Sequence, residues 1–327
     1  METSTCRGGA CPHPTTADSM EHQRSDTSRP RTFHSSLLTL HSSISSLHSS
    51  LFTFLSSLLT LLVLNSSFFI SPAPAQNENK NTDHGFRIEC PAESTDSLIF
   101  YREYLTDDYG VTFAYEYDGT FRANRWVAWQ MHNRNADKIT WRYDTFIEDD
   151  SIPEAYRVGT DEYNESNMDC GHIMASMFRL CSREQNKQTF VVGANTHPQY
   201  KKHNGMLWRR IENHVANKLN YNSFRDTLYI AAGATVYDPN TLGKTSDSLI
   251  IPKYWFMALC CLKDSAYKAA AFLTQHNNKR YSIINIENHM VTVDSLEALT
   301  GFDFFCNLPD SIEDKIEAEA DPSEWKL

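Results

Sequence analysis

Three short motifs lie close together at the centre of the chain: DCGH at residues 169–172, NTHPQ at residues 195–199 and NGMLW at residues 204–208, with Glu212 following four residues later. The last motif places an amide at the entrance of a predicted helix. Asn204 and Glu212 are eight residues apart, which we expect to put them on nearly the same helix face, about 12 Å apart along the axis. Oxygen ligands of this kind suit a hard divalent cation such as Mg²⁺, which keeps most of its waters. A neutral His172 would then act as general base on a water molecule.

The sequence around these motifs is typical of an α+β protein. Residues 208–219 repeat apolar side chains at the spacing of one helical face. A second helix is predicted over residues 293–299, with Asp294 as its cap and Gly301 as its stop. Segments rich in β-branched and aromatic residues predict strands at residues 111–117, 189–194, 227–236 and 254–262.

The central motifs resemble those of the DNA/RNA non-specific endonucleases of the ββα-metal class. Further segments agree with that family in the same order: RWVAW at 125–129, which resembles an early helix, RYDTF at 142–146, VDSLEALTG at 293–301 and NLP at 307–309. The resemblance covers residues 109–316. It implies an α+β fold in which a central antiparallel sheet is flanked by helices.

The resemblance also implies a role for each site residue. His172 would be the general base, Asn204 the one direct protein ligand of Mg²⁺ or Mn²⁺, and Glu212 a carboxylate that orients water beside the metal. Arg142 would face the scissile phosphate, and Asn195 would steady the site beside the histidine. Asp169, Cys170 and Arg209 are the expected substrate contacts. Because contacts to phosphate carry no base information, such an enzyme is nearly indifferent to sequence in DNA or RNA.

Two positions depart from the family pattern. Cys170 stands where the family motif usually has arginine, and Ala216 replaces a second family arginine one helical turn after Glu212. Replacement positive charge lies nearby in the sequence, at Lys201, Lys202, Arg209 and Arg210. The losses leave a second function open, namely a weakened or inactive nuclease fold that binds nucleic acid at the cell surface. Retention of His172, Asn204, Glu212 and Arg142 together favours the enzyme.

Composition sets broader limits. The 327 residues are 41% hydrophobic, which is enough for a globular core of one large domain or two smaller ones. A net charge of −11 argues against a general basic coat for nucleic acid, although a local basic cleft remains allowed. Cys260 and Cys261 alternate within a strand and are expected to be core thiols. The other cysteines of the globular region could pair in an oxidising compartment, with connectivity open: Cys90, Cys170, Cys181 and Cys306.

The N-terminal region has a different composition. Residues 33–77 lack Asp, Glu, Lys and Arg, and four Ser/Leu-rich heptamers follow one another from His34 to Leu61. An apolar stretch at residues 51–64, followed by Ala73-Pro74-Ala75, has the form of a signal peptide with its cleavage site. We therefore expect a secreted, periplasmic or cell-envelope protein. The alternative is a retained membrane anchor over residues 51–70, which would be the chain's contact with a membrane.

These patterns predict four regions. Residues 1–75 would be the leader or anchor, 76–108 a variable segment, 109–316 the endonuclease domain and 317–327 an acidic tail. From Asp310 onward the chain has seven acidic residues and two lysines, so we expect this end to pack loosely.

Overall fold

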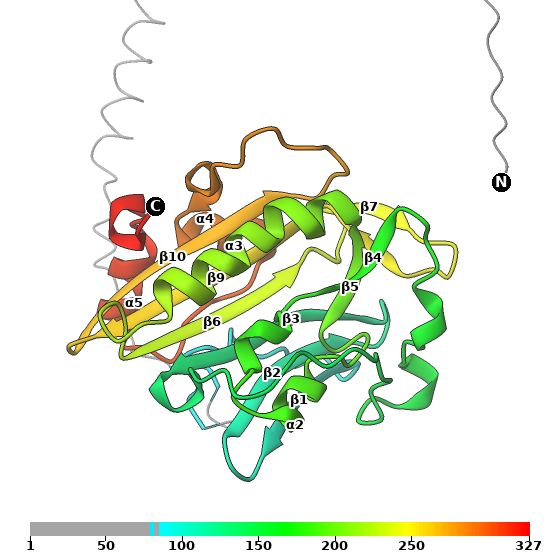
Figure 1. Cartoon of the computed structure of the whole chain (residues 1–327), viewed down its shortest axis with the longest axis horizontal. Coiled ribbons are helices and arrows are strands. Elements are labelled where there is room, and N and C mark those ends of the chain that lie inside the picture. The colour runs from blue at the N-terminus through cyan, green and yellow to red at the C-terminus, as the bar shows by residue number, and fades with distance from the viewer. Residues whose placement is uncertain (1–78, 82–84) are drawn as a thin grey trace, which may run out of the picture. The chain divides into compact units, whose positions relative to one another are not determined.

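A seven-stranded antiparallel sheet forms the centre of the protein (Figure 1). The computed structural model describes residues 79–81 and 85–327, all within one compact unit, Pro72–Leu327. The strand order is β1-β2-β3-β6-β9-β10-β11. The strands are β1 (Ile99–Thr106), β2 (Gly110–Asp118), β3 (Ala123–His132), β6 (Thr227–Ala234), β9 (Tyr254–Lys263), β10 (Ala266–Gln275) and β11 (Met290–Val291).

The central strand β9 is apolar over most of its length because both faces of the sheet are covered. In β9, the side chains from Trp255 to Cys261 are all buried. Neighbouring residues point to opposite faces, so Cys260 packs in one hydrophobic cluster and Cys261 in the other. The prediction that both are core thiols is confirmed. Within the described residues, all six cysteines are free.

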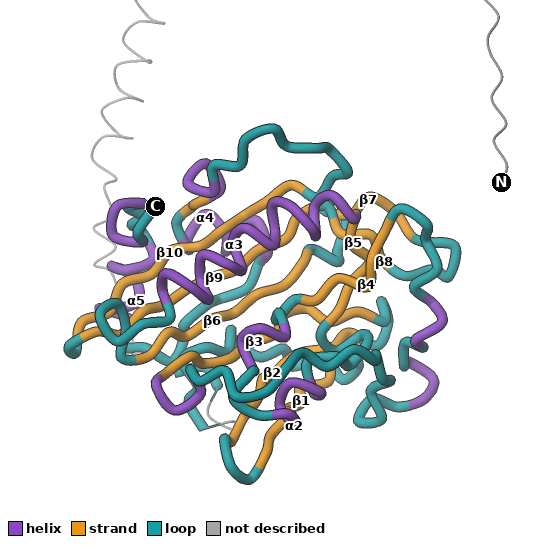
Figure 2. Tube along the Cα trace, in the orientation of Figure 1, coloured by secondary structure: helices purple, strands orange, loops and turns teal. Residues whose placement is uncertain are grey.

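One face of the sheet is covered by a long helix (Figure 2). It consists of the π-helical segment η6 (His203–Trp208), α3 (Arg209–His214) and the π-helical segment η7 (Val215–Leu219). Its apolar side includes Trp208, whose ring centroid lies 5.3 Å from that of Trp255 in β9. The predicted helical face at residues 208–219 is confirmed, and the helix begins earlier than expected.

A two-stranded hairpin leads into this helix. It pairs β4 (Met168–His172) with β5 (Thr196–Tyr200) in antiparallel register. Figure 1 shows the hairpin beside the N-terminal end of the helix, which lies along the long strands β6, β9 and β10. A second small sheet joins β7 (Thr241–Lys244) to β8 (Ile250–Pro252), and the short helix α2 (Arg183–Gln188) packs near η5 (Ser176–Arg179).

Two secondary-structure predictions are wrong. Residues 125–129 lie in β3 and not in a helix, because their apolar side chains reach both covered faces of the sheet. Residues 189–194 form turns with one isolated bridge at Val191, and the strand begins at Thr196. The buried Val191 and Val192 fill the core from a loop, which an apolar run alone does not distinguish from a strand.

The other face of the sheet is covered by α4 (Val293–Thr300) and α5 (Asp310–Glu317). The predicted cap of α4 is off by two residues, since the Thr292 side chain, and not Asp294, accepts a hydrogen bond from the Ser295 amide. Gly301 ends the helix as predicted, in the left-handed conformation at φ 71°.

The C-terminal end is packed and not loose, which contradicts the prediction for the acidic tail. The turn η9 (Pro322–Trp325) places Trp325 in the core with 1% of its surface exposed. Its ring lies 5.7 Å from that of Phe224, and its carbonyl oxygen is 2.8 Å from Nε2 of His214. The buried indole, together with a hydrogen bond from Lys268 to the Glu324 carbonyl oxygen, holds this otherwise charged segment against the fold.

The folded unit also extends beyond the predicted N-terminal boundary, because β1 is an edge strand of the large sheet. The predicted leader or anchor lies outside the described residues. Across residues 79–81 and 85–327, none of the helices has the length and apolar character required to cross a bilayer.

Candidate active site

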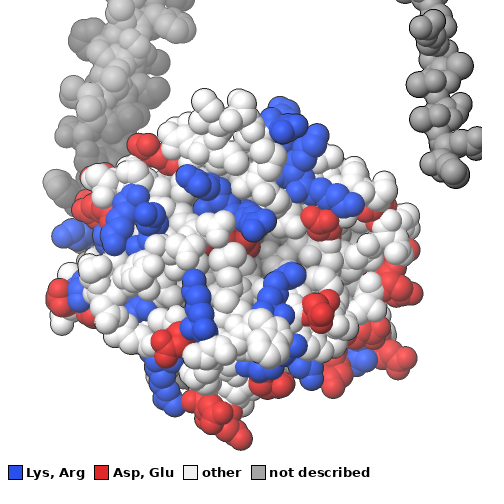
Figure 3. Space-filling model, viewed as in Figure 1, with Lys and Arg blue, Asp and Glu red and all other residues white. Residues whose placement is uncertain are grey.

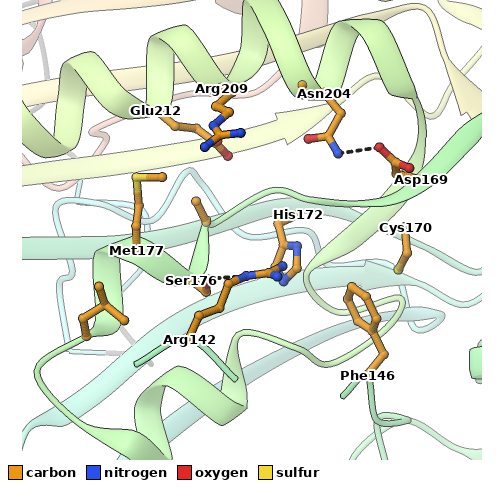
Figure 4. Close-up of a pocket in the computed structure, with 13 residues that line it drawn as sticks. Arg142, Phe146, Asp169, Cys170, His172, Ser176, Met177, Asn204, Arg209 and Glu212 are labelled. Carbon is orange, nitrogen blue, oxygen red and sulfur yellow. Dashed lines mark hydrogen bonds between the residues drawn. The ribbon is translucent and has the colours of Figure 1, made fainter. Parts of the chain in front are cut away.

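A cavity of about 610 Å³ opens between the helix, the β4–β5 hairpin and the loop before η5. It brings together seven of the eight predicted site residues, which Figure 4 shows around a common space. These are Arg142, Asp169, Cys170, His172, Asn204, Arg209 and Glu212. The eighth, Asn195, does not line the cavity.

The hairpin depends on glycine at position 171. A Cβ atom there would lie 2.4 Å from both Cβ and Oε1 of Gln199, closer than atoms can approach. Gln199 in turn hydrogen-bonds through Nε2 to Nδ1 of His203, at 2.9 Å. Nε2 of His203 is 3.0 Å from Oγ1 of Thr274 in β10. The glycine between Cys170 and His172 thus lets β5 tie the hairpin to the helix and to the main sheet.

The His172 imidazole is held by aromatic rings and not by hydrogen bonds. It packs edge-on against Phe190, with ring centroids 4.7 Å apart, and against Phe146 at 5.2 Å. Its Nε2 is buried and has no hydrogen-bond partner among the described residues. Burial, assisted by the positive charge of Arg142, lowers the pKa of His172 to about 3. The ring is therefore neutral near pH 7 and one of its nitrogens is available to accept a proton.

Asn195 positions the chain beside this histidine. Its Oδ1 accepts the amide of Met174 at 2.8 Å, and its Nδ2 donates to the carbonyl oxygens of Met174 and Thr189. The main-chain carbonyl oxygen of Asn195 accepts a hydrogen bond from the amide of Ile173 at 2.9 Å. The side chain is fully buried. The prediction that Asn195 steadies the site fits this geometry, whereas a direct catalytic contact does not.

Asn204 lies within the first turn of the helix and is not its N-cap. Its Nδ2 donates to Oδ2 of Asp169 at 2.8 Å, as the dashed line in Figure 4 marks. Because the amide nitrogen is held by the carboxylate of the hairpin, its Oδ1 is left as an acceptor at the cavity. Asp169 therefore sets the orientation of the Asn204 amide.

Glu212 projects into the same cavity as Asn204, as expected, but regular α-helix geometry is not the reason. Eight residues at 3.6 per turn leave two side chains about 80° apart. The π-helical segment η6 uses more residues per turn, which reduces this angle. Glu212 is 7% exposed, and burial raises the pKa of its carboxyl to about 8, against the opposing effect of Arg209 and Arg142. A buried carboxyl of this kind is suited to a site that receives a cation.

Arg142 approaches from the opposite wall of the cavity. Its Nε donates to Oγ of Ser176 at 3.2 Å, and its guanidinium carbon lies 4.8 Å from the centre of the Phe190 ring. These two contacts fix the plane of the group through Nε and one face. Its terminal nitrogens make no hydrogen bond among the described residues and face the cavity shown in Figure 4.

Comparison with known proteins agrees with the family resemblance of the site residues. The sequence model of the DNA/RNA non-specific endonucleases matches residues 97–311, more than half of the chain. The chain belongs to this family. A nuclease from Nostoc sp. is 31% identical over 225 residues, covering 64% of this chain and 76% of that protein. The mitochondrial nuclease EXOG of Danio rerio is 23% identical over 203 residues, covering 58% of this chain and 57% of its own.

A solved structure agrees in fold. The crystal structure of the EndoG/EndoGI complex contains a chain that superimposes with a TM-score of 0.56 at 18% identity, covering 65% of this chain and 88% of that one. The α+β architecture with a large antiparallel sheet is therefore the ββα-metal endonuclease fold, as predicted. In this non-specific endonuclease, β4, β5 and the helix from His203 to Leu219 form the ββα unit.

The two departures from the endonuclease pattern have different surroundings. Cys170 lines the cavity, and burial raises the pKa of its thiol to about 12, so the side chain is neutral where the family usually has arginine. Ala216 is buried in the hydrophobic core and does not line the cavity.

Sequence reasoning missed Phe146, Ser176 and Met177 as cavity residues. Phe146 is the last residue of the RYDTF segment. Nothing in the sequence of that segment shows that its ring packs on His172. Ser176 follows the histidine by four residues and begins the short turn η5, where spacing does not predict direction. These positions depend on how the loop folds back over η5 and α2.

Proposed function

We propose that this protein is an exported, metal-dependent endonuclease that hydrolyses phosphodiester bonds of DNA, RNA or both with little sequence preference. The observation that carries the proposal is one cavity lined by a neutral imidazole, an amide whose oxygen is left as an acceptor, a buried carboxyl and two arginines. Phosphodiester hydrolysis requires a base for water and positive charge at the phosphate. In this cavity His172 would be the base, and Arg142 and Arg209 would provide part of the positive charge.

The donor set fits a hard divalent cation. Asn204 would hold Mg²⁺ or Mn²⁺ through Oδ1, because Asp169 retains its amide nitrogen, and Glu212 would orient water at the same side. Oxygen ligands, few in number, are what Mg²⁺ accepts while it keeps several waters. The ion would supply positive charge that stabilises the phosphate as negative charge develops there. The raised pKa of Glu212 supports the same assignment, since a nearby cation would favour its ionised form.

His172 would accept the proton of the attacking water. The water oxygen forms a bond to phosphorus, the bond from phosphorus to the leaving sugar oxygen breaks, and that oxygen takes a proton from solvent. Because burial holds the imidazole neutral, the base is in its active form at neutral pH. The negative charge of a bound phosphate would stabilise the imidazolium that results.

Arg142 and Arg209 would stabilise the pentacovalent phosphate from two sides. Arg142 is fixed by Ser176 and Phe190, so little reorganisation is needed when the charge develops. Figure 3 shows Lys and Arg side chains gathered around the hollow on this face, although the whole chain is acidic. A local basic cleft of this kind attracts a polyanion without coating the molecule in positive charge.

An exposed aromatic side chain next to Arg142 in the sequence offers a surface for bases. Trp141, next to Arg142, is 76% exposed, and the guanidinium of Arg183 lies 5.7 Å from its ring centre. An exposed indole stacks on any base and so adds affinity without sequence selection. This feature supports a substrate with unpaired or partly unstacked bases.

Export rests on the leader pattern alone, and the retained anchor is its alternative. Both keep the endonuclease outside the cytoplasm.

The runner-up function is a weakened or inactive nuclease fold that only binds nucleic acid, favoured by the neutral thiol at position 170. A plasmid-nicking assay separates it from the enzyme. Residues 76–327 should convert supercoiled plasmid to the nicked form with Mg²⁺ and stop when a chelator is added. The His172→Ala variant is the matched control for a contaminating nuclease. Nicking by parent and variant at equal rates, or binding of DNA without any nicking, contradicts the proposed function.

A further inference from the structure

Three carboxylates meet on the side of the sheet opposite the active-site helix. Asp294 and Glu297 lie on one face of α4, and Glu317 is the last residue of α5. One oxygen from each lies within 4.8 Å of the others. Both helices pack through Val293 and Ile316 onto the sheet, in the cluster that does not contain the active-site helix.

Glu317 is the member that calls for an explanation. It is 5% exposed, and its Oε1 is buried without a hydrogen-bond partner among the described residues. The carboxyl also lies at the C-terminal end of α5, where the helix dipole disfavours negative charge. A buried acceptor facing two more carboxylates is destabilising unless a proton or a cation lies between them.

Other charges around the cluster add to the repulsion. Asp303 and Glu313 face the same group, and Lys80 faces Asp303. Burial is the main cause and the neighbouring carboxylates the second. Together they raise the pKa of Glu317 to about 10 and that of Glu313 to about 8. The pKa of Glu297 rises to about 7, chiefly through burial.

The spacing of the oxygens fits a particular ion. Ca²⁺ binds oxygen at about 2.3–2.6 Å, so two of its ligands can be no more than about 5 Å apart. Oε1 of Glu297 already accepts the amide of Phe304 at 2.7 Å, which fixes the carboxylate while leaving Oε2 available. Asp294 is exposed, so the ion can enter from solvent and keep water ligands there.

We propose that Asp294, Glu297 and Glu317 form a second cation site, which takes Ca²⁺ and joins α4 to α5. The site is separate from the one at Asn204. Its expected effect is structural, because α5 leads directly into η9, where Trp325 is inserted on the other face of the sheet. A cation at Glu317 would hold the C-terminal segment in place on both sides.

The test is a thermal melt of the full chain in which Asn204→Ala has removed the active-site ligand. Saturating Ca²⁺ should raise the Tm by about 5 °C over the value in chelator. Glu317→Gln in the same background should lose most of this shift, because the amide keeps the shape and removes the charge. Asp314→Asn removes an exposed carboxylate from the same helix and should keep the shift.

Glu297→Gln provides a second variant, since Oε1 of the amide can still accept the Phe304 hydrogen bond. If Glu317→Gln does not fold, the Ca²⁺-dependent Tm shift of Glu297→Gln tests the site instead. The absence of any Ca²⁺-dependent shift in the Asn204→Ala background overturns the proposal and means that the carboxyls share protons. A shift that persists in both glutamine variants overturns it as well, because the ion is then bound elsewhere.

Discussion

His172 and Asn204 have separate tasks in the same cavity, and each can be removed alone. His172 lacks a hydrogen-bond partner for Nε2 within the described residues, so truncation leaves no partner unsatisfied. We expect His172→Ala and Asn204→Ala each to lower the hydrolysis rate by about two or more powers of ten. Circular dichroism should show both variants folded. A folded variant that cleaves DNA as fast as the parent removes that residue from the mechanism.

Cys170 marks a missing contact with the substrate. Arginine there would be charged and could donate two hydrogen bonds to phosphate, whereas the buried thiol is neutral. We expect Cys170→Arg to raise kcat/KM on DNA and to steepen its fall with salt, because one more phosphate contact releases one more counterion. Cys170→Ser is the matched control. Equal activity and equal salt slope in a variant whose Tm is unchanged would count against this role.

His276 is a buried residue whose neutral form is fixed by geometry. Its Nε2 accepts the amide of Tyr200 at 2.7 Å, and Nδ1 is 2.7 Å from the carbonyl oxygen of Pro252. Burial lowers its pKa from 6.5 to about 4, against the opposing effect of that carbonyl. Below pH 6.5 His276 binds a proton in the unfolded chain but stays neutral in the folded protein. Stability from this residue is therefore present above pH 6.5 and is lost as the pH falls toward 4.

The prediction is that His276→Gln, which can keep both hydrogen bonds, loses less stability than the parent between pH 6.5 and 4. Melting both proteins across this range in the same buffer series measures it. Parallel curves would mean that other groups, such as His203 and His197, account for the acid sensitivity.

At the scale of elements, the β4–β5 hairpin depends on a close approach that only glycine allows. Gly171→Ala should destabilise the protein by about 1–3 kcal/mol, because the new methyl group would displace Gln199 from its contact with His203. Gly205→Ala is the control, since nothing lies within 4 Å of its Cβ position and alanine favours the helix. Thermal melts of both variants provide the measurement. If Gly171→Ala is as stable as Gly205→Ala, the packing argument fails.

Sequence patterns predicted the elements whose spacing is regular. Residues 111–117 alternate as a strand and residues 208–219 repeat as a helix, and both elements are present. The apolar runs at residues 227–236 and 254–262 also form strands, of which β6 ends at Ala234. The resemblance indicated a helix at residues 125–129, which lie in β3; a fully buried strand and a buried helix are both continuous apolar runs. The π-helical turns that align Asn204 with Glu212 have no sequence signal at all. They result from packing of the helix on the hairpin and the sheet.

For the molecule as a whole, motifs in register predicted which residues meet, but not how they are oriented. Seven site residues from three segments line one cavity, as ordered motifs indicated. The hydrogen bond from Asn204 to Asp169 and the aromatic contacts of His172 depend on side-chain directions that spacing does not fix. The burial of Trp325 was not predicted for a related reason. A single apolar residue in an acidic segment forms no repeating pattern from which a buried face could be predicted.

Export is a property of the whole chain, and it can be decided by where the mature protein begins. The apolar stretch at residues 51–64 and the small residues Ala73 and Ala75 predict cleavage just before Gln76. Such a product would retain β1 and every element of the cavity, because these begin at Ile99 or later. We therefore expect active protein outside the cytoplasm whose N-terminal sequence starts at or near Gln76. Full-length chain in the membrane fraction, with nuclease activity facing outward, would instead identify the segment as an anchor.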